Sequence, residues 1–106
     1  GITSDGQAIY GATQRDVVKA FALSDGHELW KQEALLNRRL STPAVTGDAV
    51  AVGDYEGYVH FLSRRDGHLL GRIQVGSDPI YSPLQATPRG VLVQSSGGNL
   101  ILLGLR

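Results

Sequence analysis

Short apolar segments separated by turn-forming residues recur along the whole chain. The middle of the chain contains four of them, Thr42 to Thr46, Ala49 to Asp54, Tyr58 to Ser63 and Leu69 to Val75. Gly-Asp, Glu-Gly and Asp-Gly pairs stand between them, and such pairs favour tight hairpins. Segments this short and this rich in Val, Ile, Leu and Tyr predict strands rather than packed helices. Glu33 to Leu40 is the only stretch long enough for a short helix.

These segments belong to a repeat with an offset of 41 residues. Asp25-Gly26-His27 recurs as Asp66-Gly67-His68, and Ala8-Ile9 aligns with Ala49-Val50. A period near ~41 is shared by propeller blades and by helical HEAT or armadillo repeats. The strand pattern decides between them, because four strands joined by tight hairpins make one propeller blade. The sequence therefore predicts an all-β fold, a β-propeller fragment of four-stranded antiparallel blades.

Some of the predicted strands are apolar at every position instead of alternating. Ala49 to Val52, Val91 to Val93 and Leu100 to Leu103 have this character. A strand has a continuous apolar run when both faces of its sheet are buried. Each blade of a propeller packs against a neighbour on both sides, so we expect both faces of these strands to be covered.

The repeat divides the chain into about two and a half blades. Residues 1–34 are predicted to form a partial blade whose first strand is absent or truncated, and residues 42–76 to form a full blade. Residues 82–106 are predicted to supply three strands of a final blade. Since two and a half blades cannot close a ring, we expect the chain to be the C-terminal part of a larger propeller.

The charge balance argues against some classes of partner. The chain has ten Lys and Arg residues and ten Asp and Glu residues, so it is formally neutral. This argues against broad capture of nucleic acid or of an anionic membrane surface, both of which need basic clusters. There is no Cys, which excludes a disulfide or a thiolate metal site.

Two stretches of sequence resemble known families. Residues 20–30 (AFALSDGHELW) resemble the blade motif of quinoprotein-type propellers, with Trp30 four residues after Gly26; in the next unit Gly71 stands where that Trp would be. Residues 35–43 (LLNRRLSTP) and 52–60 (VGDYEGYVH) are similar to the C-terminal blades of the BamB family. Its members are the propeller lipoproteins of the outer-membrane β-barrel assembly machinery.

This resemblance implies a non-catalytic scaffold without a cofactor, built as a ring of eight blades. It implies a location at the periplasmic face of the outer membrane, with a lipid anchor outside this segment. The implied partner is the barrel-inserting subunit, bound through its periplasmic polypeptide-transport-associated domains, together with nascent outer-membrane proteins whose insertion the scaffold assists. Neither nucleic acid nor direct membrane contact is expected.

The candidate partner-binding residues are Arg38, Arg39 and Leu40, which occupy the loop equivalent to the family's contact loops. Two guanidinium groups beside leucines give charge-assisted donors on an apolar base, a common composition at binding hot spots. A solvated loop with its leucines packed into the blade is the alternative. We predict that reversing both charges, Arg38→Glu with Arg39→Glu, weakens partner binding and leaves the fold intact.

Several other motifs contain residue types found at catalytic or ligand sites, and we interpret each as structural. The residue types of a hydrolytic triad occur near Asp25, but a triad needs side chains that converge in space. A tight Asp-Gly turn explains these residues better. The histidines lie in separate strands or blades, which disfavours zinc. The sets are Ser24, Asp25 and His27 for a triad; His27, His60 and His68 for a metal; Asp54 to Gly57 for calcium; and Ser95 to Asn99 for a phosphate.

Two other functions remain open on the sequence alone. One is a quinone-dependent dehydrogenase, an enzyme with the same fold and a central calcium and quinone site. The other is a structural repeat module that binds a cell-wall glycan. Fold does not decide among these, because unrelated functions share one architecture.

Overall fold

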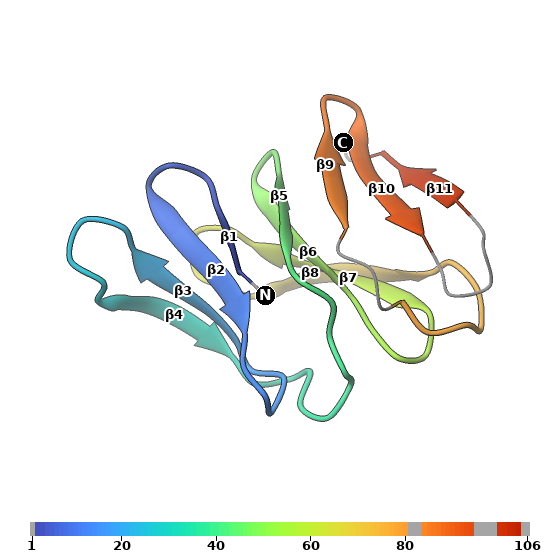
Figure 1. Ribbon diagram of the computed structural model, residues 1–106, viewed down its shortest axis with the longest axis horizontal. Helices are drawn as coiled ribbons and strands as arrows, with labels where there is room; N and C mark the ends of the chain where they lie inside the picture. Colours follow the sequence, from blue (N-terminus) through green and yellow to red (C-terminus); the bar gives the residue numbers. More distant parts are fainter. Residues whose placement is uncertain (1, 81–83, 95–99, 105–106) are drawn as a thin grey trace.

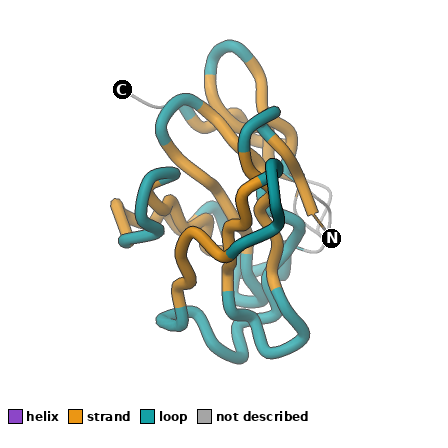
Figure 2. Tube along the Cα trace, turned by 90° about the vertical axis from the view of Figure 1, so that its left-hand side faces the viewer, coloured by secondary structure: helices purple, strands orange, loops and turns teal. Residues whose placement is uncertain are grey.

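The computed structural model describes residues 2–80, 84–94 and 100–104, which form strands and loops with no helix (Figures 1 and 2). The strands make three antiparallel sheets that stand side by side and do not close into a ring. The first sheet holds β1 (Ile2–Ser4), β2 (Ala8–Ala12), β3 (Val18–Ala22) and β4 (Glu28–Gln32). The second holds β5 (Ala44–Thr46), β6 (Ala49–Gly53), β7 (Tyr58–Ser63) and β8 (Leu69–Gln74). The third holds β9 (Gln85–Thr87), β10 (Gly90–Gln94) and β11 (Leu100–Leu103).

The predicted all-β propeller blades are therefore confirmed, and the repeat extends to details of the backbone. The pairing of β3 with β4 shifts register between Ala20 and Phe21, and that of β7 with β8 shifts between Phe61 and Leu62. The two bulges lie at positions with the same offset of 41 as the sequence repeat. The glycines of the two Asp-Gly turns have almost equal φ angles, 79° at Gly26 and 78° at Gly67. Only a residue without a Cβ adopts this left-handed conformation at little cost.

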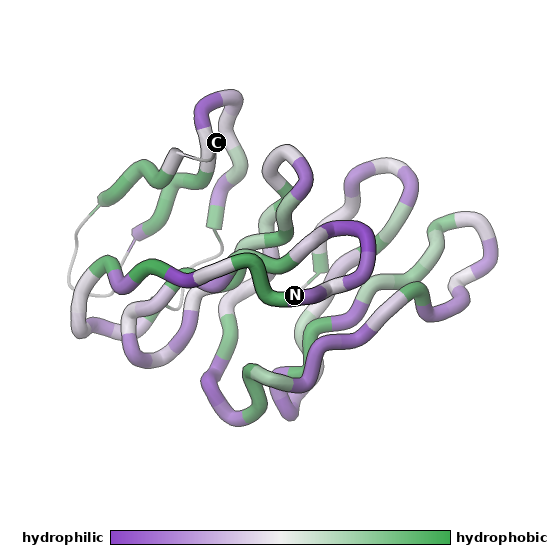
Figure 3. Tube along the Cα trace, turned by 180° about the vertical axis from the view of Figure 1, so that it is seen from behind, coloured by the Kyte–Doolittle hydropathy of each residue, from purple (hydrophilic) through white to green (hydrophobic). Residues whose placement is uncertain are grey.

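Two apolar layers hold the three sheets together. One fills the space between the first and second sheets, and the other lies between the second and third. Hydrophobic residues accordingly follow the strands while hydrophilic ones gather at the turns (Figure 3). The first layer comprises Ala8, Tyr10, Val18, Ala20, Trp30, Leu35, Val50, Val52 and Leu62. The second comprises Ala44, Ala49, Ala51, Val59, Phe61, Ile80, Leu84, Val91 and Val93.

Burial of both faces is confirmed for β6 but not for β11. All five residues of β6 are buried, because its side chains alternate between the two apolar layers. In β11 every second side chain is exposed, with 66% of Leu100 and 49% of Leu102 accessible. Two covered faces were expected of a blade inside a ring, and the three sheets described here do not close into one. Within the described part of the chain, no sheet packs on the outer face of β11.

The first blade also differs from the prediction. The first strand of residues 1–34 was expected to be absent or truncated, yet β1 pairs with β2 and completes a four-stranded sheet. With three residues, β1 is as short as β5 and β9. Its sequence, Ile-Thr-Ser, carries a single large apolar side chain, so its pattern is too weak to read as a strand. Glu33 to Leu40 contains turns instead of a helix.

The first two sheets are linked by Trp30. Its indole Nε1 donates a hydrogen bond to the carbonyl oxygen of Arg64 at 3.0 Å, in the turn between β7 and β8. A Cβ on Gly67 would lie 2.3 Å from the indole ring, so the ring rests directly on the glycine backbone. Gln32 donates to the carbonyl oxygen of Gly67 at 3.0 Å and extends the contact. The outer strand of one blade therefore attaches to the turn of the next.

No helix long and apolar enough to span a membrane occurs within the described residues.

Candidate functional site

The candidate binding residues lie in the loop that crosses from β4 to β5, and we call residues 37–40 the arginine loop. This loop lies at the same end of the molecule as the β2–β3 and β6–β7 turns (Figure 1). Two of its residues have left-handed backbones, with φ of 62° at Asn37 and 53° at Arg39. For residues with a side chain this conformation costs about 1–2 kcal/mol each. Surrounding contacts must therefore hold the loop in place.

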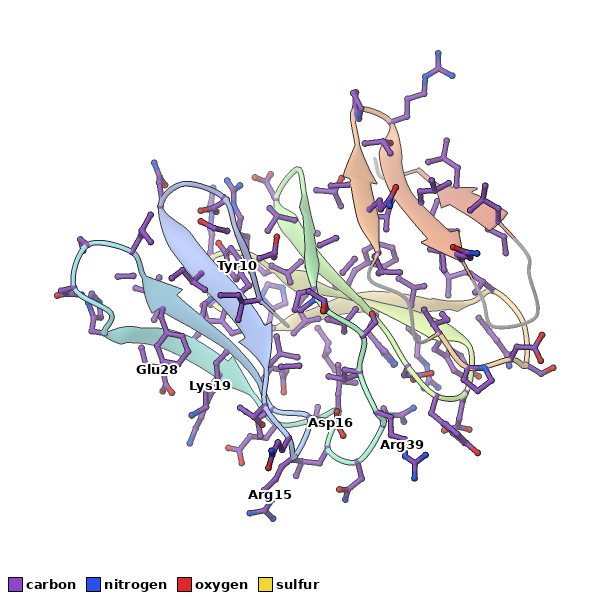
Figure 4. The ribbon with its side chains drawn as sticks, viewed as in Figure 1. Tyr10, Arg15, Asp16, Lys19, Glu28 and Arg39 are labelled. Carbon is purple, nitrogen blue, oxygen red and sulfur yellow. The ribbon has the colours of Figure 1, made fainter. Side chains whose placement is uncertain are left out.

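Asp16 holds the arginine loop from the first blade. Its Oδ2 accepts a hydrogen bond from the Arg39 amide at 3.1 Å, and its Oδ1 accepts one from the Leu40 amide at 2.9 Å. Asp16 is buried and itself has a left-handed backbone, with φ of 65°. Asp16 and Arg39 lie side by side at this end of the molecule (Figure 4). Because carboxylate-to-amide bonds are charge-assisted, Asp16 offsets part of the strain at Arg39.

Asp54 holds the loop from the second blade. Its side chain is fully buried, and its Oδ1 accepts hydrogen bonds from the amides of Glu56 at 2.8 Å and Tyr58 at 3.0 Å. Its Oδ2 lies 2.6 Å from His60 Nε2 and 3.3 Å from Arg38 Nη1. A buried carboxylate is stable only when its oxygens are satisfied in this way. Both oxygens of Asp54 have two partners each.

The ionisation of the Asp54–His60 pair follows from these contacts. Burial acts to raise the pKa of Asp54, but the hydrogen bonds from His60 and from the amides of Tyr58 and Glu56 outweigh it and lower that pKa below its usual value. Burial lowers the pKa of His60, and the bond to Asp54 only partly opposes this shift. The pair is therefore an ionised carboxylate with a neutral imidazole, whose Nε2–H donates to Asp54.

The structure gives the three predicted residues different surroundings. The Arg38 guanidinium, whose side chain is 30% exposed, lies between Asp54 at 3.3 Å and Glu56 Oε1 at 3.6 Å. Leu40 is half-buried against the apolar layer between the first two sheets. Only Arg39 is exposed, and its guanidinium carbon lies 5.2 Å from the centroid of the Tyr55 ring. These differences argue for changing Arg38 and Arg39 separately, because Arg38→Glu would set a carboxylate against two others.

Four residues of this site were not identified from the sequence: Asp16, Asp54, Tyr55 and His60. Residues 54–57 were considered for calcium and interpreted as a turn, and the structure does place them in a turn. The spacing of Asp54 and His60 was a usable signal, because side chains near the facing ends of two hairpin strands meet across the sheet. Asp16 gave no signal, since its partners lie more than twenty residues away.

The remaining motifs lie in turns. Asp25 Oδ1 accepts from the His27 amide at 3.0 Å and lies 2.5 Å from His27 Nδ1, and Asp66 makes the same two contacts with His68. Both pairs are exposed and stabilise their own turns. Within residues 2–80, 84–94 and 100–104, no cluster of His, Asp or Glu side chains could hold a metal ion. Ser95 to Asn99 lies outside the described residues.

Comparison with known proteins identifies the family, although no family model matches the chain. The chain is 53% identical over 103 residues, 97% of its length, to "Outer membrane protein assembly factor BamB" of Bordetella pertussis. It also superimposes on the crystal structure of BamB from Moraxella catarrhalis with a TM-score of 0.85 and 28% identity, over 93% of this chain. The chain belongs to the BamB family. It covers 27% of the Bordetella protein and 30% of the Moraxella chain, so it spans about a quarter to a third of a BamB protein.

The propeller fold extends beyond BamB. A quinohemoprotein alcohol dehydrogenase from Comamonas testosteroni matches 87% of this chain with a TM-score of 0.71 and 17% identity, covering 16% of that protein. At this identity the likeness concerns the fold alone.

Proposed function

We propose that this chain is part of a non-catalytic scaffold subunit of the outer-membrane protein assembly complex. In this proposal the scaffold binds the periplasmic domains of the barrel-inserting subunit and assists insertion of β-barrel proteins. It acts at the periplasmic face of the outer membrane, held there by a lipid anchor. The observation that supports this most strongly is the 53% identity to a BamB protein over nearly the whole chain.

The site geometry supports binding better than chemistry. The buried Asp54 has no free lone pair to accept a substrate proton, because four donors already occupy its two oxygens. His60 is buried against it and is 3% exposed. A general base must reach the proton that it removes. What the site offers to a partner is a rigid loop at the junction of two blades, and loops on a rigid scaffold are common binding elements.

The proposal is tested with the intact protein and the purified polypeptide-transport-associated domains of the barrel-inserting subunit. We expect saturable binding by titration calorimetry, and faster insertion of a β-barrel substrate into proteoliposomes when the scaffold is added. Absence of binding together with an unchanged insertion rate would contradict the proposal. Alcohol oxidation by the intact protein loaded with calcium and pyrroloquinoline quinone would favour the dehydrogenase instead.

A further inference from the structure

One oxygen of the buried Asp54 carboxylate is shared by two donors of different kinds. Its Oδ2 lies 2.6 Å from His60 Nε2 and 3.3 Å from Arg38 Nη1. A guanidinium stays protonated in proteins, whereas an imidazole gains or loses its charge within the ordinary range of pH. Proton uptake by His60 would therefore place two cations on one carboxylate oxygen.

The other groups that face His60 add to this conflict of charge. Arg72 stands opposite His60 in the pairing of β7 with β8, and its guanidinium carbon lies 4.6 Å from the centroid of the Tyr58 ring. The Tyr58 ring is itself 6.1 Å from the His60 ring. On the other side, β6 places the apolar Val52 opposite His60. Among the described residues, Asp54 is the single carboxylate that pairs with His60. A protonated His60 thus meets one carboxylate and two guanidinium groups.

Arg38 is the cation that can move away. Its side chain is 30% exposed, and its second partner, Glu56 Oε1 at 3.6 Å, belongs to an exposed side chain. His60 is 3% exposed and lies closer to Asp54. Displacing a protonated His60 would leave a buried charge without a partner, which is costly. Moving Arg38 costs less, because Glu56 and water can accept its N–H donors.

The Arg38 guanidinium helps to hold the arginine loop to the second blade. The Tyr55 amide donates to the carbonyl oxygen of Arg38 at 2.8 Å, while Asp16 holds the loop to the first blade through backbone amides. The residues on either side of Arg38, Asn37 and Arg39, have left-handed and therefore strained backbones. When the Arg38 side chain moves away, the bond from Tyr55 loses this support, and we expect it to open more often.

From this geometry, we propose that Asp54, His60 and Arg38 form a pH-sensitive switch on the arginine loop. With His60 neutral, both donors bind Oδ2 and the loop is held to the second blade. With His60 protonated, the imidazolium keeps Oδ2, the Arg38 guanidinium turns toward Glu56 and solvent, and the loop loosens at the junction of the first two blades. The switch goes beyond the proposed function and does not rest on it, because every group involved belongs to this chain.

The switch responds to acid. Burial holds the pKa of His60 below its ordinary value near 6.5, although the bond to Asp54 opposes this shift. The loop is therefore held at neutral pH and loosens as the pH falls through the lowered pKa of His60. The exposed His27 and His68 also pair with carboxylates. Within the described part of the chain no arginine forms an ion pair with those carboxylates, so protonation of these histidines displaces nothing.

The first test measures amide hydrogen exchange in the intact protein at pH 7.5 and at pH 5, as protection factors corrected for the intrinsic effect of pH. The protection of the Tyr55 amide should fall at least about tenfold in acid, the effect of losing one charge-assisted contact. The amides of β6 report unfolding of the whole blade and should lose less protection. An equal loss in β6 would mean that no local switch exists.

His60→Gln keeps a donor to Asp54 but cannot be protonated, so it should abolish the additional loss of protection at Tyr55. The switch is wrong if this variant loses protection at Tyr55 as the unmodified protein does.

The second test uses the reciprocity of coupled equilibria. If protonation of His60 displaces Arg38, removing the Arg38 charge must favour protonation. Arg38→Gln should therefore raise the pKa of His60 in an NMR titration of its imidazole ring in the intact protein. Arg39→Gln is the matched control, since it removes the same charge from the same loop but its guanidinium lies over Tyr55. An unchanged pKa in Arg38→Gln, or an equal rise in both variants, would overturn the switch.

Arg72→Gln identifies which cation moves. This variant should also raise the pKa of His60, because it removes a neighbouring charge. It should nevertheless keep the loss of protection at Tyr55 in acid, since Arg38 is still displaced. If Arg72→Gln abolished that loss, Arg72 would be the displaced cation and the assignment to Arg38 would be wrong.

Discussion

The first two blades share one backbone but place their large aromatic side chain on different strands. Across the first sheet the neighbouring positions hold Tyr10, Ala20 and Trp30, and across the second sheet the equivalent positions hold Ala51, Phe61 and Gly71. In the first blade the indole on the outer strand reaches the next blade. In the second blade the aromatic ring lies one strand further in, opposite a glycine. The comparison shows that a blade can keep its fold while the contact joining it to its neighbour changes.

This exchange has a visible consequence on the outer strand of the second blade. A hollow of about 660 Å³ lies over β8, bordered by Phe61, Leu70, Gly71 and Ile73. The equivalent place on the first blade is occupied by Trp30. All six residues of β8 are exposed. The aromatic ring on β7 covers the inner part of the sheet but leaves the outer part open.

The turns that hold the arginine loop differ in a similar way. Thr13 Oγ1 accepts from the amides of Arg15 at 3.3 Å and Val17 at 3.2 Å, and Asp54 Oδ1 accepts from the equivalent amides of its own turn. The second oxygen of Asp54 is what allows it also to bind His60 and Arg38. A single change from hydroxyl to carboxylate thus converts a local turn into a contact between elements.

The largest expected effect comes from Trp30. Trp30→Ala removes a buried ring and its bond to Arg64, and should lower the free energy of unfolding of the intact protein by about 3–5 kcal/mol. The measurement is the shift in the urea midpoint at constant slope. A loss below about 1 kcal/mol would show that the indole does not join the blades.

Gly67→Ala provides the matched control for this contact. In the unmodified protein the new Cβ would overlap the Trp30 ring and would sit on a left-handed backbone. In the Trp30→Ala background the overlap disappears and only the backbone strain of about 1 kcal/mol remains. The two changes should therefore be strongly non-additive, as expected for groups in contact. Strict additivity would contradict the observed packing.

The second expected effect is the loss of the Asp54 carboxylate. Asp54→Ala leaves two amides and the His60 ring without a partner inside the protein, and should cost about 3 kcal/mol. Thr13→Ala removes only the turn contact that the first blade shares, and should cost about 1 kcal/mol. Urea unfolding of the two variants measures the difference. Equal losses would mean that the additional contacts of Asp54 contribute nothing.

The third prediction concerns pH. The pKa of His60 is lower in the folded state than in the unfolded chain, where it is about 6.5. Between these two values the unfolded state binds more protons, so stability falls as the pH drops below about 6.5. The lowered pKa of Asp54 adds a further loss at pH values below about 4. Acid therefore destabilises the second blade.

His60→Gln separates the loss of stability caused by His60 from the loss caused by Asp54, because a glutamine can donate to Asp54 but does not titrate. Unfolding by urea at pH 7.5 and at pH 5 should show a smaller difference for this variant than for the unmodified protein. His68→Gln is the control, since His68 is exposed and its ring pairs with Asp66 in its own turn. An equal pH effect in both variants would place the titrating group elsewhere.

The sequence predicted most of the fold because the repeat and the strand pattern carried the same information. The ends of β7 match the predicted segment, and β6 and β8 each end one residue early. The predicted strand Thr42 to Thr46 was too long. Pro43 has no N–H for the ladder of hydrogen bonds, and β5 begins at Ala44. The apolar run of β11 predicts two covered faces only inside a closed ring, and its outer face is exposed because the three sheets do not close.

The site was less predictable than the fold. Arg38 and Arg39 are adjacent and chemically identical, so only the positions of Asp54, Glu56 and Tyr55 separate a partly buried ion pair from an exposed cation. These partners come from another hairpin, and the backbone is left-handed at Arg39 but not at Arg38. A sequence motif identifies such a loop, but the direction of each side chain depends on its tertiary contacts.

The smallest expected effect is at Gly71, the position equivalent to Trp30. Apart from its two chain neighbours, no described residue has an atom within 4 Å of the place where a Cβ on Gly71 would be, and the φ of Gly71 lies outside the left-handed range. Gly71→Ala should therefore stabilise the protein by about 0.4–1 kcal/mol, chiefly because the unfolded chain loses freedom. The measurement is again the urea midpoint, with Gly57→Ala as the contrasting change.

Gly57→Ala should destabilise, since its Cβ would lie 2.3 Å from the carbonyl oxygen of Gly76. Stabilisation by Gly71→Ala would show that β8 has room for a side chain at the position equivalent to Trp30 of β4, the residue that contacts the next blade. If Gly71→Ala destabilised instead, a part of the protein outside the described residues would have to pack against this glycine. The second blade would then be joined to its neighbour as closely as the first, through a backbone contact in place of an indole.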